Sequence, residues 1–205
     1  MNYYFDLDNT LYETANLTKD MLRAICTNVV EKRDISYEVV EKDVNENFNS
    51  TNDNIFDYAR KVAINYEVDE NFVIKAVKDV IADGEKYVFK DGKEFIEKLK
   101  ESSGNKLFLL TYVPKGNQEY QQLKLLGSKL SKYFEGIYIV TEYKYELDLD
   151  YTNGIFFDDS PRDLKGLYEK HPIRLIRIRK PNNKRSAIDL DFEIEEYSDF
   201  SEINI

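Results

Sequence analysis

The order of apolar and polar positions divides this chain into two kinds of segment. From Val88 onward, short apolar runs alternate with amphipathic helical patterns, which is typical of a parallel sheet whose strands are connected by helices. The expected strands cover residues 106–111, 136–140, 154–158 and 173–178, and the expected helices cover residues 92–100, 118–126 and 163–169. A further apolar run, Tyr3–Leu7, opens the chain and has the character of a strand buried on both faces. The pattern therefore predicts an α/β fold with helices flanking a parallel sheet.

Residues 14–86 follow a different pattern, with helical spacing and no clear strand. Apolar side chains recur three or four positions apart in three stretches, which predicts helices that each bury one face. The three sets are Met21, Leu22, Ile25 and Val29; Ile55, Tyr58, Ala59 and Val62; and Phe72, Val73, Ala76, Val77 and Val80. We expect this segment to form a small helical unit, with Cys26 in its core.

Composition indicates a globular protein and restricts its partners. The chain has 205 residues, 42% of them hydrophobic, which suffices for one ordinary domain with a sizeable core and an inserted element. Its net charge of −10 argues against binding to nucleic acids or anionic membranes in general, because both partners would be repelled. A small or cationic partner is easier to accommodate.

The scarcity of cysteine and histidine limits the kinds of site that the chain can form. Cys26 is the only cysteine and cannot form an internal disulfide, and with the single His171 it cannot form a Cys/His metal cluster. A metal ion would therefore be a hard ion with oxygen ligands. The N-terminus lacks a basic segment followed by an apolar run, and no stretch approaches the roughly 18 apolar residues of a membrane span. We expect a cytoplasmic protein without a membrane segment.

Two acids at the end of the opening strand are the first candidates for chemistry. Asp6 and Asp8 follow the aromatic run Tyr3–Phe5, with one residue between them. Because side chains alternate along a strand, both carboxylates are expected to project to the same side. Neighbouring carboxylates repel each other, so either one stays protonated or a cation lies between them.

A second acidic pair ends another expected strand. Asp158 and Asp159 follow the apolar residues 154–157, and ligands of an open parallel sheet collect at the carboxyl ends of its strands. The two acidic pairs are therefore expected to meet in one crevice, where oxygen ligands of this charge suit Mg²⁺. Thr111, at the end of the expected strand of residues 106–111, can donate to an anion, and Lys144 can add a positive charge.

These residues resemble, in the same order, the four motifs of the haloacid dehalogenase (HAD) superfamily, a large group of aspartate-nucleophile phosphohydrolases and their relatives. Asp6-Leu7-Asp8-Asn9-Thr10 is similar to motif one, Thr111 to motif two, Lys144 to motif three, and Asp158-Asp159 with Asp163 to motif four. The resemblance implies a Rossmann-like catalytic core made of residues 1–13 and 87–205. It also implies that residues 14–86 are the helical cap that many members insert after motif one.

Two positions depart from the usual motifs. The motif-three lysine is often followed by proline, whereas a tyrosine follows Lys144, so that Lys129 and Lys132 are open as alternatives. The motif-two threonine is often followed by asparagine, whereas Tyr112 follows Thr111. The second change would alter contacts to the substrate and leave the threonine hydroxyl in place.

The resemblance implies a two-step phosphoryl transfer. Asp6 would attack phosphorus and form an aspartyl phosphate. Asp8 would protonate the leaving oxygen and then take a proton from the attacking water, and for this its pKa must be high enough to hold a proton. The implied ligands of Mg²⁺ are Asp6, the backbone carbonyl of Asp8, Asp158 and Asp159, and the implied phosphoryl-binding residues are Thr111 and Lys144.

The leading hypothesis is a Mg²⁺-dependent phosphatase that acts on a small phosphorylated metabolite. The opening motif is similar to that of some pyrimidine nucleotidases, which favours a nucleoside monophosphate as substrate. Asp8 argues against dehalogenation, because a halide leaving group needs no proton, and the Lys-Thr-Gly-Thr sequence of the ion-pumping branch does not follow Asp6. A sugar-phosphate mutase, which returns the phosphoryl group to the substrate, is the nearest alternative.

The charged C-terminal region leaves further alternatives open. A basic stretch, residues 174–185, precedes an acidic stretch, residues 189–202. Their simplest interpretation is two solvated faces that partly neutralise each other, while the alternative is that residues 179–185 reach toward an anionic ligand. A catalytically silent family member that binds an anion or a protein through this stretch is a second class of function. A polynucleotide end phosphatase is a third, and the net charge weighs against it.

Overall fold

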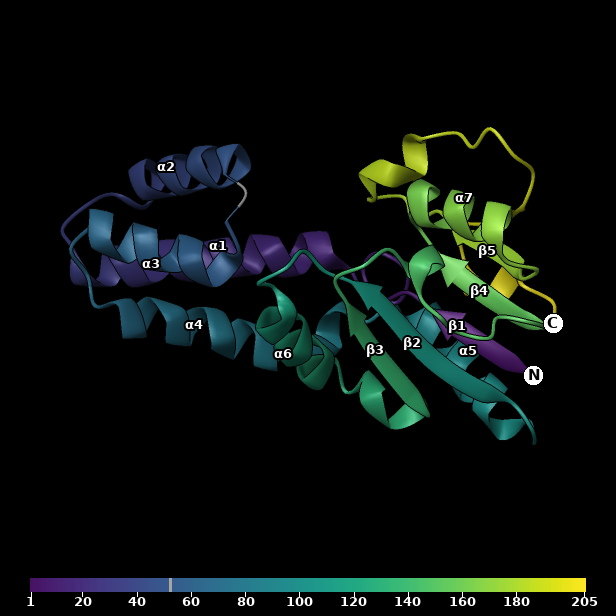
Figure 1. Ribbon diagram of the computed structural model, residues 1–205. Helices are drawn as coiled ribbons and strands as arrows, with labels where there is room; N and C mark the ends of the chain where they lie inside the picture. The colour runs from purple at the N-terminus through teal and green to yellow at the C-terminus, as the bar shows by residue number, and fades with distance from the viewer. Residues whose placement is uncertain (52) are drawn as a thin grey trace.

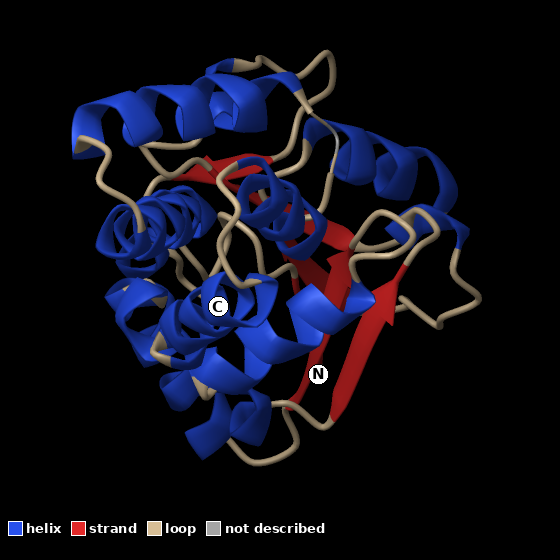
Figure 2. Ribbon diagram, turned by 90° about the vertical axis from the view of Figure 1, so that its left-hand side faces the viewer, coloured by secondary structure: helices blue, strands red, loops and turns tan. Residues whose placement is uncertain are grey.

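Six parallel strands form one sheet in the computed structural model, which describes residues 1–51 and 53–205 (Figure 1). The strands are β1 Asn2–Phe5, β2 Lys106–Tyr112, β3 Gly136–Val140, β4 Gly154–Asp158, β5 Arg174–Ile178 and β6 Glu195–Tyr197. They are flanked by α5 Lys90–Glu101, α6 Gln118–Ser128 and α7 Pro161–Lys170 (Figure 2). The predicted α/β fold with a Rossmann-like core is confirmed.

The strand order, β3-β2-β1-β4-β5-β6, puts a change of direction next to β1. Phe5 is in register with Leu109 of β2 on one side and with Phe157 of β4 on the other. The chain therefore builds the sheet outward from β1 first in one direction and then in the other. Such a switch point leaves a crevice at the carboxyl ends of the two central strands. The residues that follow Phe5 and Phe157 are consequently brought together.

Alternating side chains of β1 explain why an aromatic run opens the chain. Tyr3 and Phe5 belong to the core cluster that includes Phe95 of α5, whereas Tyr4 belongs to the cluster on the other face, with Leu164 of α7. The Phe5 ring stacks on Phe157 at 4.6 Å between centroids. Both faces of β1 are thus buried, and the acids that follow it begin at the end of a rigid, central strand.

Four helices between β1 and α5 pack together at one end of the molecule (Figure 1). They are α1 Thr14–Lys32, α2 Tyr37–Ser50, α3 Ile55–Asn65 and α4 Glu70–Ala82. The three predicted apolar sets lie on α1, α3 and α4, and Cys26 is buried as predicted. Phe72 is an exception, because it is exposed at the start of α4. The division into a core of residues 1–13 and 87–205 and a cap of residues 14–86 stays a prediction.

The structure differs from the predicted elements in three places. The opening strand ends at Phe5 and not at Leu7, because the chain turns and Asn9 adopts a left-handed conformation with φ of 60°. The pattern gave no prediction of α2, in which only Val40 and Val44 are buried, or of the three-residue strand β6. None of the helices in the described ranges has the length and apolarity needed to cross a bilayer.

Candidate active site

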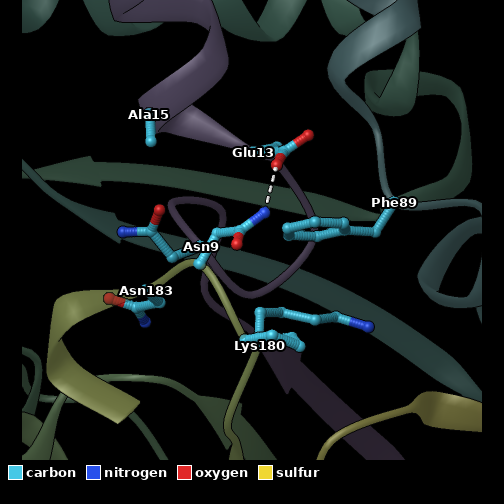
Figure 3. A pocket seen from close by; sticks show the side chains of 8 residues that line it. Asn9, Glu13, Ala15, Phe89, Lys180 and Asn183 are labelled. Carbon is cyan, nitrogen blue, oxygen red and sulfur yellow. Dashed lines mark hydrogen bonds between the residues drawn. The ribbon is translucent and has the colours of Figure 1, made fainter. Parts of the chain in front are cut away.

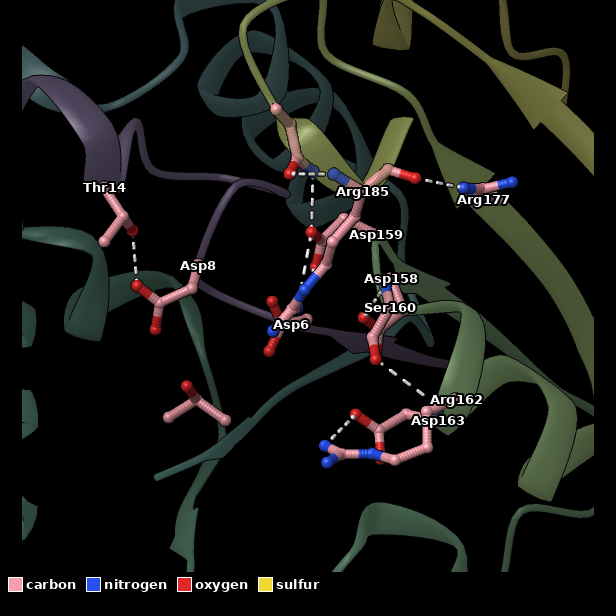
Figure 4. Close-up of polar contacts among 12 residues, drawn as sticks. Asp6, Asp8, Thr14, Asp158, Asp159, Ser160, Arg162, Asp163, Arg177 and Arg185 are labelled. Carbon is pink, nitrogen blue, oxygen red and sulfur yellow. Dashed lines mark hydrogen bonds and ion pairs between the residues drawn. The ribbon is translucent and has the colours of Figure 1, made fainter. Parts of the chain in front are cut away.

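Three buried carboxylates meet at the carboxyl ends of β1 and β4. Each of Asp6, Asp158 and Asp159 offers an oxygen atom, and these three atoms lie within 4.8 Å of one another (Figure 4). Their side chains are at most 6% exposed. The predicted meeting of the two acidic pairs at this edge therefore holds for three of the four acids.

Lys144 is the cation that lies between two of these acids. It begins a short 3₁₀ helix, Lys144–Glu146, and its Nζ donates to Asp6 Oδ1 at 2.6 Å and to Asp158 Oδ2 at 2.7 Å. The two other candidate lysines lie elsewhere: Lys129 pairs with Glu85, and Lys132 lies over the ring of Tyr133. The structure thus brings Lys144 to the carboxylates, although no proline follows it.

The carboxylate cluster carries more negative charge than its neighbours balance. Burial raises the pKa of Asp6 well above its usual range, and the charges of Asp158 and Asp159 add to this against the opposing effect of Lys144. Burial and Asp158 raise the pKa of Asp159 to about 6. Conversely, the acids raise the pKa of Lys144 and keep its ammonium group charged in spite of burial. A further cation would relieve this excess.

Asp8 lies in a different environment from Asp6. Its carboxylate accepts a hydrogen bond from Thr14 Oγ1 (Figure 4). It also accepts from Gln121 Nε2 at 2.7 Å and from the ammonium group of Lys124. Although burial opposes the shift, Lys124 lowers the pKa of Asp8, and the hydrogen bonds from Thr14 and Gln121 act in the same direction. This differs from the expectation of a pKa high enough to hold a proton. The physical reason for the lowered pKa is Lys124 of α6, whose side chain is only 1% exposed and pairs with Asp8.

Thr111 lies at the same edge of the sheet, near the end of β2. Its hydroxyl is fully buried and accepts a hydrogen bond from Gln121 Nε2 at 2.6 Å. Gln121 therefore bridges Thr111 and Asp8, since its amide nitrogen donates to both. The threonine hydroxyl keeps its own hydrogen for an acceptor that enters the crevice.

The arrangement of these residues agrees with the family comparison. The family model of haloacid dehalogenase-like hydrolases matches residues 3–166, which include all the residues of the predicted motifs. The chain belongs to this family. No curated protein sequence matches this HAD hydrolase.

Proteins of known structure with the same fold include both a phosphatase and a dehalogenase. The HAD phosphatase of Thermococcus onnurineus is 19% identical with a TM-score of 0.64, over 98% of this chain and 94% of that one. YfnB of Bacillus subtilis, assigned as a HAD hydrolase and solved with bound magnesium, is 14% identical with a TM-score of 0.60, over 98% and 95%. The 2-haloacid dehalogenase of Pseudomonas syringae pv. Tomato is 17% identical with a TM-score of 0.59, also over 98% and 95%. At these identities the likeness establishes the fold and leaves the reaction to the site.

The carboxylate cluster of this HAD hydrolase fits a hard divalent cation. Its three donors, from Asp6, Asp158 and Asp159, are the anionic oxygen ligands that Mg²⁺ and Ca²⁺ prefer. The carboxylate of Asp8 is not among them in the part of the chain that the structure describes, because it points toward Thr14. Asp8 could therefore contribute to such a site through its backbone carbonyl, as the resemblance implies, while its side chain serves another purpose.

Asp163, the last residue of the fourth motif, does not cap α7. The helix begins at Pro161, which is well suited to the first helical position, and Ser160 is the N-cap that accepts from the amide of Asp163. The helix therefore begins two residues before the start of the expected helix of residues 163–169. Its carboxylate is buried, and one oxygen contacts Arg162 at 3.2 Å.

Sequence reasoning missed the partners that α6 supplies to the motifs. Gln121 and Lys124 are three residues apart, so they lie on one face of the helix and reach Thr111 and Asp8 together. Their spacing was a usable signal. A lysine on a helix is, however, usually solvated, and the pattern alone gave no reason to bury Lys124.

Proposed function

We propose that this protein is a Mg²⁺-dependent phosphatase that hydrolyses a small phosphorylated metabolite through an aspartyl phosphate. The observation that carries the proposal is the buried cluster of Asp6, Asp158 and Asp159, with Lys144 between two of its members. Anionic oxygen ligands and an ammonium group at the end of a central strand are what phosphoryl transfer requires, because that reaction depends mainly on positioning and on balancing charge.

Asp6 is the proposed nucleophile. Its Oδ1 atom accepts from Lys144 at 2.6 Å, which fixes the orientation of the carboxylate at the end of β1. Attack on phosphorus forms the acyl phosphate and releases the alcohol, so one difficult displacement becomes two easier ones. Lys144 and the Thr111 hydroxyl are suited to balance the charge on the phosphoryl oxygens.

Asp8 is the proposed proton carrier. It gives a proton to the leaving oxygen in the first step and removes one from water in the second. In the resting arrangement Lys124 favours the ionised form, which is ready for the second step. Asp8 must take up a proton before the first step, and Lys124 controls the pH at which this happens.

Mg²⁺, held by Asp6, Asp158, Asp159 and the backbone carbonyl of Asp8, would neutralise the acids and polarise the phosphoryl group. Asn183 Nδ2 donates to Asp159 Oδ2 at 2.6 Å, which restrains the orientation of that ligand. A phosphatase is favoured over a dehalogenase because Asp8 is held by three donors near the nucleophile, and a halide leaving group has no use for such a carboxylate.

An assay of phosphate esters tests the proposal. The wild-type chain should release phosphate from a panel of small esters in the presence of Mg²⁺, and Asp6→Asn should lower kcat by about 10⁴-fold or more, as loss of a nucleophile does in other enzymes. Asp148→Asn is a matched control, because Asp148 is exposed in the loop before β4 and is not one of the three carboxylates of the cluster. Full turnover by Asp6→Asn, or no turnover of any ester by the wild type, would refute the proposal.

A further inference from the structure

A groove of about 320 Å³ lies beside the carboxylate cluster, between the start of α1 and the loop that follows β5. Its polar lining includes Asn9, Thr14, Thr18, Asn183, Lys184 and Arg185. Both walls are connected to the proposed catalytic acids: Thr14 donates to Asp8, and Asn183 donates to Asp159. The groove therefore opens next to the point where a phosphoryl group would react, and it has the size of a site for a small ligand.

The charge of this groove is opposite to that of the whole chain. Lys184 and Arg185 line it, and no acidic side chain is among its lining residues within the part of the chain that the structure describes. The whole chain, in contrast, carries a net charge of −10. Two cations that line a concave surface on such a protein favour the binding of an anion there.

Arg185 retains donors for a ligand. Its Nη1 donates to both oxygens of Asp159, at 3.1 and 3.4 Å. Its Nε and Nη2 groups form no hydrogen bond within the described residues, and its side chain is 48% exposed. A guanidinium group has five N–H donors and can contact two anions at once. Arg185 can thus stay beside Asp159 while it binds a group in the groove.

Two other arginines hold the loop that presents Arg185. Arg177 is fully buried, and its Nη2 donates to the carbonyl oxygens of Arg185 and Ile188 at 2.6 and 2.7 Å (Figure 4). Arg179 donates to the carbonyl oxygen of Ser186 from Nε and Nη2. The basic stretch of the sequence therefore divides into arginines that build the loop and one that faces the site. A loop fixed in this way gives the guanidinium a defined position.

A smaller pocket adjoins this groove and differs from it. It shares Asn9 and Asn183 with the groove, and Glu13, Phe89 and Lys180 also line it (Figure 3). Its volume of about 30 Å³ has room for roughly one water molecule. The carboxylate of Glu13 projects there and accepts from Asn182. The small pocket is therefore unsuited to an anionic group, which leaves the larger groove as the binding position.

We propose that the groove binds a second anionic group of the phosphorylated substrate, a carboxylate or a second phosphate, and that Arg185 is the residue that recognises it. This inference rests on the proposed function and narrows its substrate class to small metabolites with two anionic groups. Lys184 adds positive charge from the same wall, and the side-chain amide of Asn9 supplies a neutral donor.

A binding experiment with two matched probes tests this inference. The full-length Asp6→Asn variant with Mg²⁺, which cannot turn over substrate by the proposed route, is titrated with 3-phosphoglycerate and with glycerol 3-phosphate, which has a hydroxymethyl group in place of the carboxylate. We expect 3-phosphoglycerate to bind about 10-fold more tightly or better, the size of a charge-assisted contact. Adding Arg185→Gln should abolish this preference and leave glycerol 3-phosphate within about 3-fold of its original affinity. The pair fructose 1,6-bisphosphate and fructose 6-phosphate repeats the comparison with a second phosphate.

The control variant is Arg174→Gln, which removes the same charge at the start of β5, where the arginine is 40% exposed. It should keep the preference. Equal affinities of the paired probes in both series, or an unchanged preference in Arg185→Gln, would overturn the inference. Hydrolysis of the panel of phosphate esters by the wild type, with 3-phosphoglycerate and fructose 1,6-bisphosphate included, tests the phosphatase proposal separately. If no ester is hydrolysed while the Arg185-dependent preference persists, the anion site stands and the phosphatase proposal does not.

Discussion

Asp6 and Asp8 are two residues apart, yet they lie in two regions with opposite electrostatic character. Around Asp6, three buried carboxylates share Lys144 and one contact with Arg185, so negative charge is in excess. Around Asp8, a single carboxylate accepts from three donors, and one of them, the ammonium group of Lys124, balances its negative charge. The pKa of Asp6 is accordingly raised and that of Asp8 lowered.

This difference explains how a buried carboxylate, Asp6, and a half-buried one, Asp8, can follow the same strand so closely. The turn after β1 separates them, since Asp8 points toward α1 and α6 while Asp6 points toward β4 (Figure 4). A cation in addition to the lysines is therefore needed on the Asp6 side alone. We infer that the two regions divide the work, with charge balance for phosphoryl transfer at Asp6 and proton transfer at Asp8.

Of the changes that test this division of work, removing the Asp8 carboxylate should have the largest effect on kcat. Asp8→Asn should lower kcat for alkyl phosphates by about 10²–10⁴-fold, the usual contribution of a positioned acid or base. The loss should be much smaller for the first step with p-nitrophenyl phosphate, whose leaving group needs no proton. Burst kinetics with both substrates measure this. An equal loss in the first step for the two substrates would assign Asp8 to positioning only.

The Asp6 region could be predicted from the sequence, whereas the partners in the Asp8 region could not. The Asp6 region comes from local patterns, because apolar runs locate the strands and parallel topology then brings their carboxyl ends together. The Asp8 region depends on Gln121 and Lys124, which lie 113 and 116 residues further along the chain. Their approach is set by how α6 packs beside the sheet, and a polar residue on a helix has the same local pattern whether it faces solvent or a buried carboxylate.

The short strand β6 could not be predicted from the local sequence either. The strand β6 consists of Glu195, Glu196 and Tyr197, which carry no apolar alternation. It is held partly by contacts that the local sequence does not encode: Arg174 pairs with Glu195, and Arg177 and Arg179 pair with Glu196. The basic and acidic stretches near the C-terminus thus partly neutralise each other, but Arg177 is fully buried, so they are not simply the two solvated faces of the simpler interpretation. Within the basic stretch, Arg185 alone contacts Asp159.

Replacing Lys144 or Lys124 by methionine should lower the free energy of unfolding by different amounts in the two regions. Lys144→Met leaves Asp6 and Asp158 without their cation, so the free energy of unfolding without Mg²⁺ should fall by about 3–5 kcal/mol, as when a buried ion pair loses one partner. Lys124→Met should cost about 1–3 kcal/mol, because Asp8 keeps Thr14 and Gln121 and is 25% exposed. Urea titrations in EDTA measure both values. Equal losses would contradict the proposed imbalance.

The lysine of α6 should also set the alkaline limit of activity. Lys124 lowers the pKa of Asp8, so Lys124→Met should raise that pKa. The protonated form, which the first step needs, then persists to higher pH, and the falling limb of kcat/KM should move to higher pH. Lys132→Met, at an exposed lysine, is the matched control. An unmoved limb in a folded Lys124→Met variant would mean that another group supplies the proton.

Mg²⁺ should stabilise the protein more at pH 7 than at pH 5. The folded-state pKa of Asp159, about 6, lies above the usual value of about 3.9, so the folded state binds more protons than the unfolded state between these limits. Without Mg²⁺ this group therefore makes the free energy of unfolding fall as pH rises from about 4 to about 6. Bound Mg²⁺ stabilises the ionised form of Asp159. At pH 5 the cation must first displace a proton from this carboxylate, so it adds less stability than at pH 7.

Melting curves with Mg²⁺ and with EDTA at the two pH values measure this difference, and each kcal/mol corresponds to roughly 2–4 °C in a domain of this size. Asp159→Asn should weaken the pH dependence, because the contribution of this side chain is then absent while those of Asp6 and Asp158 remain. Asp148→Asn should retain it, since that residue is exposed and outside the cluster. A Mg²⁺-induced shift that is the same at pH 5 and pH 7 would mean that the cation binds away from Asp159, and the contrast between the Asp6 and Asp8 regions would then need another explanation.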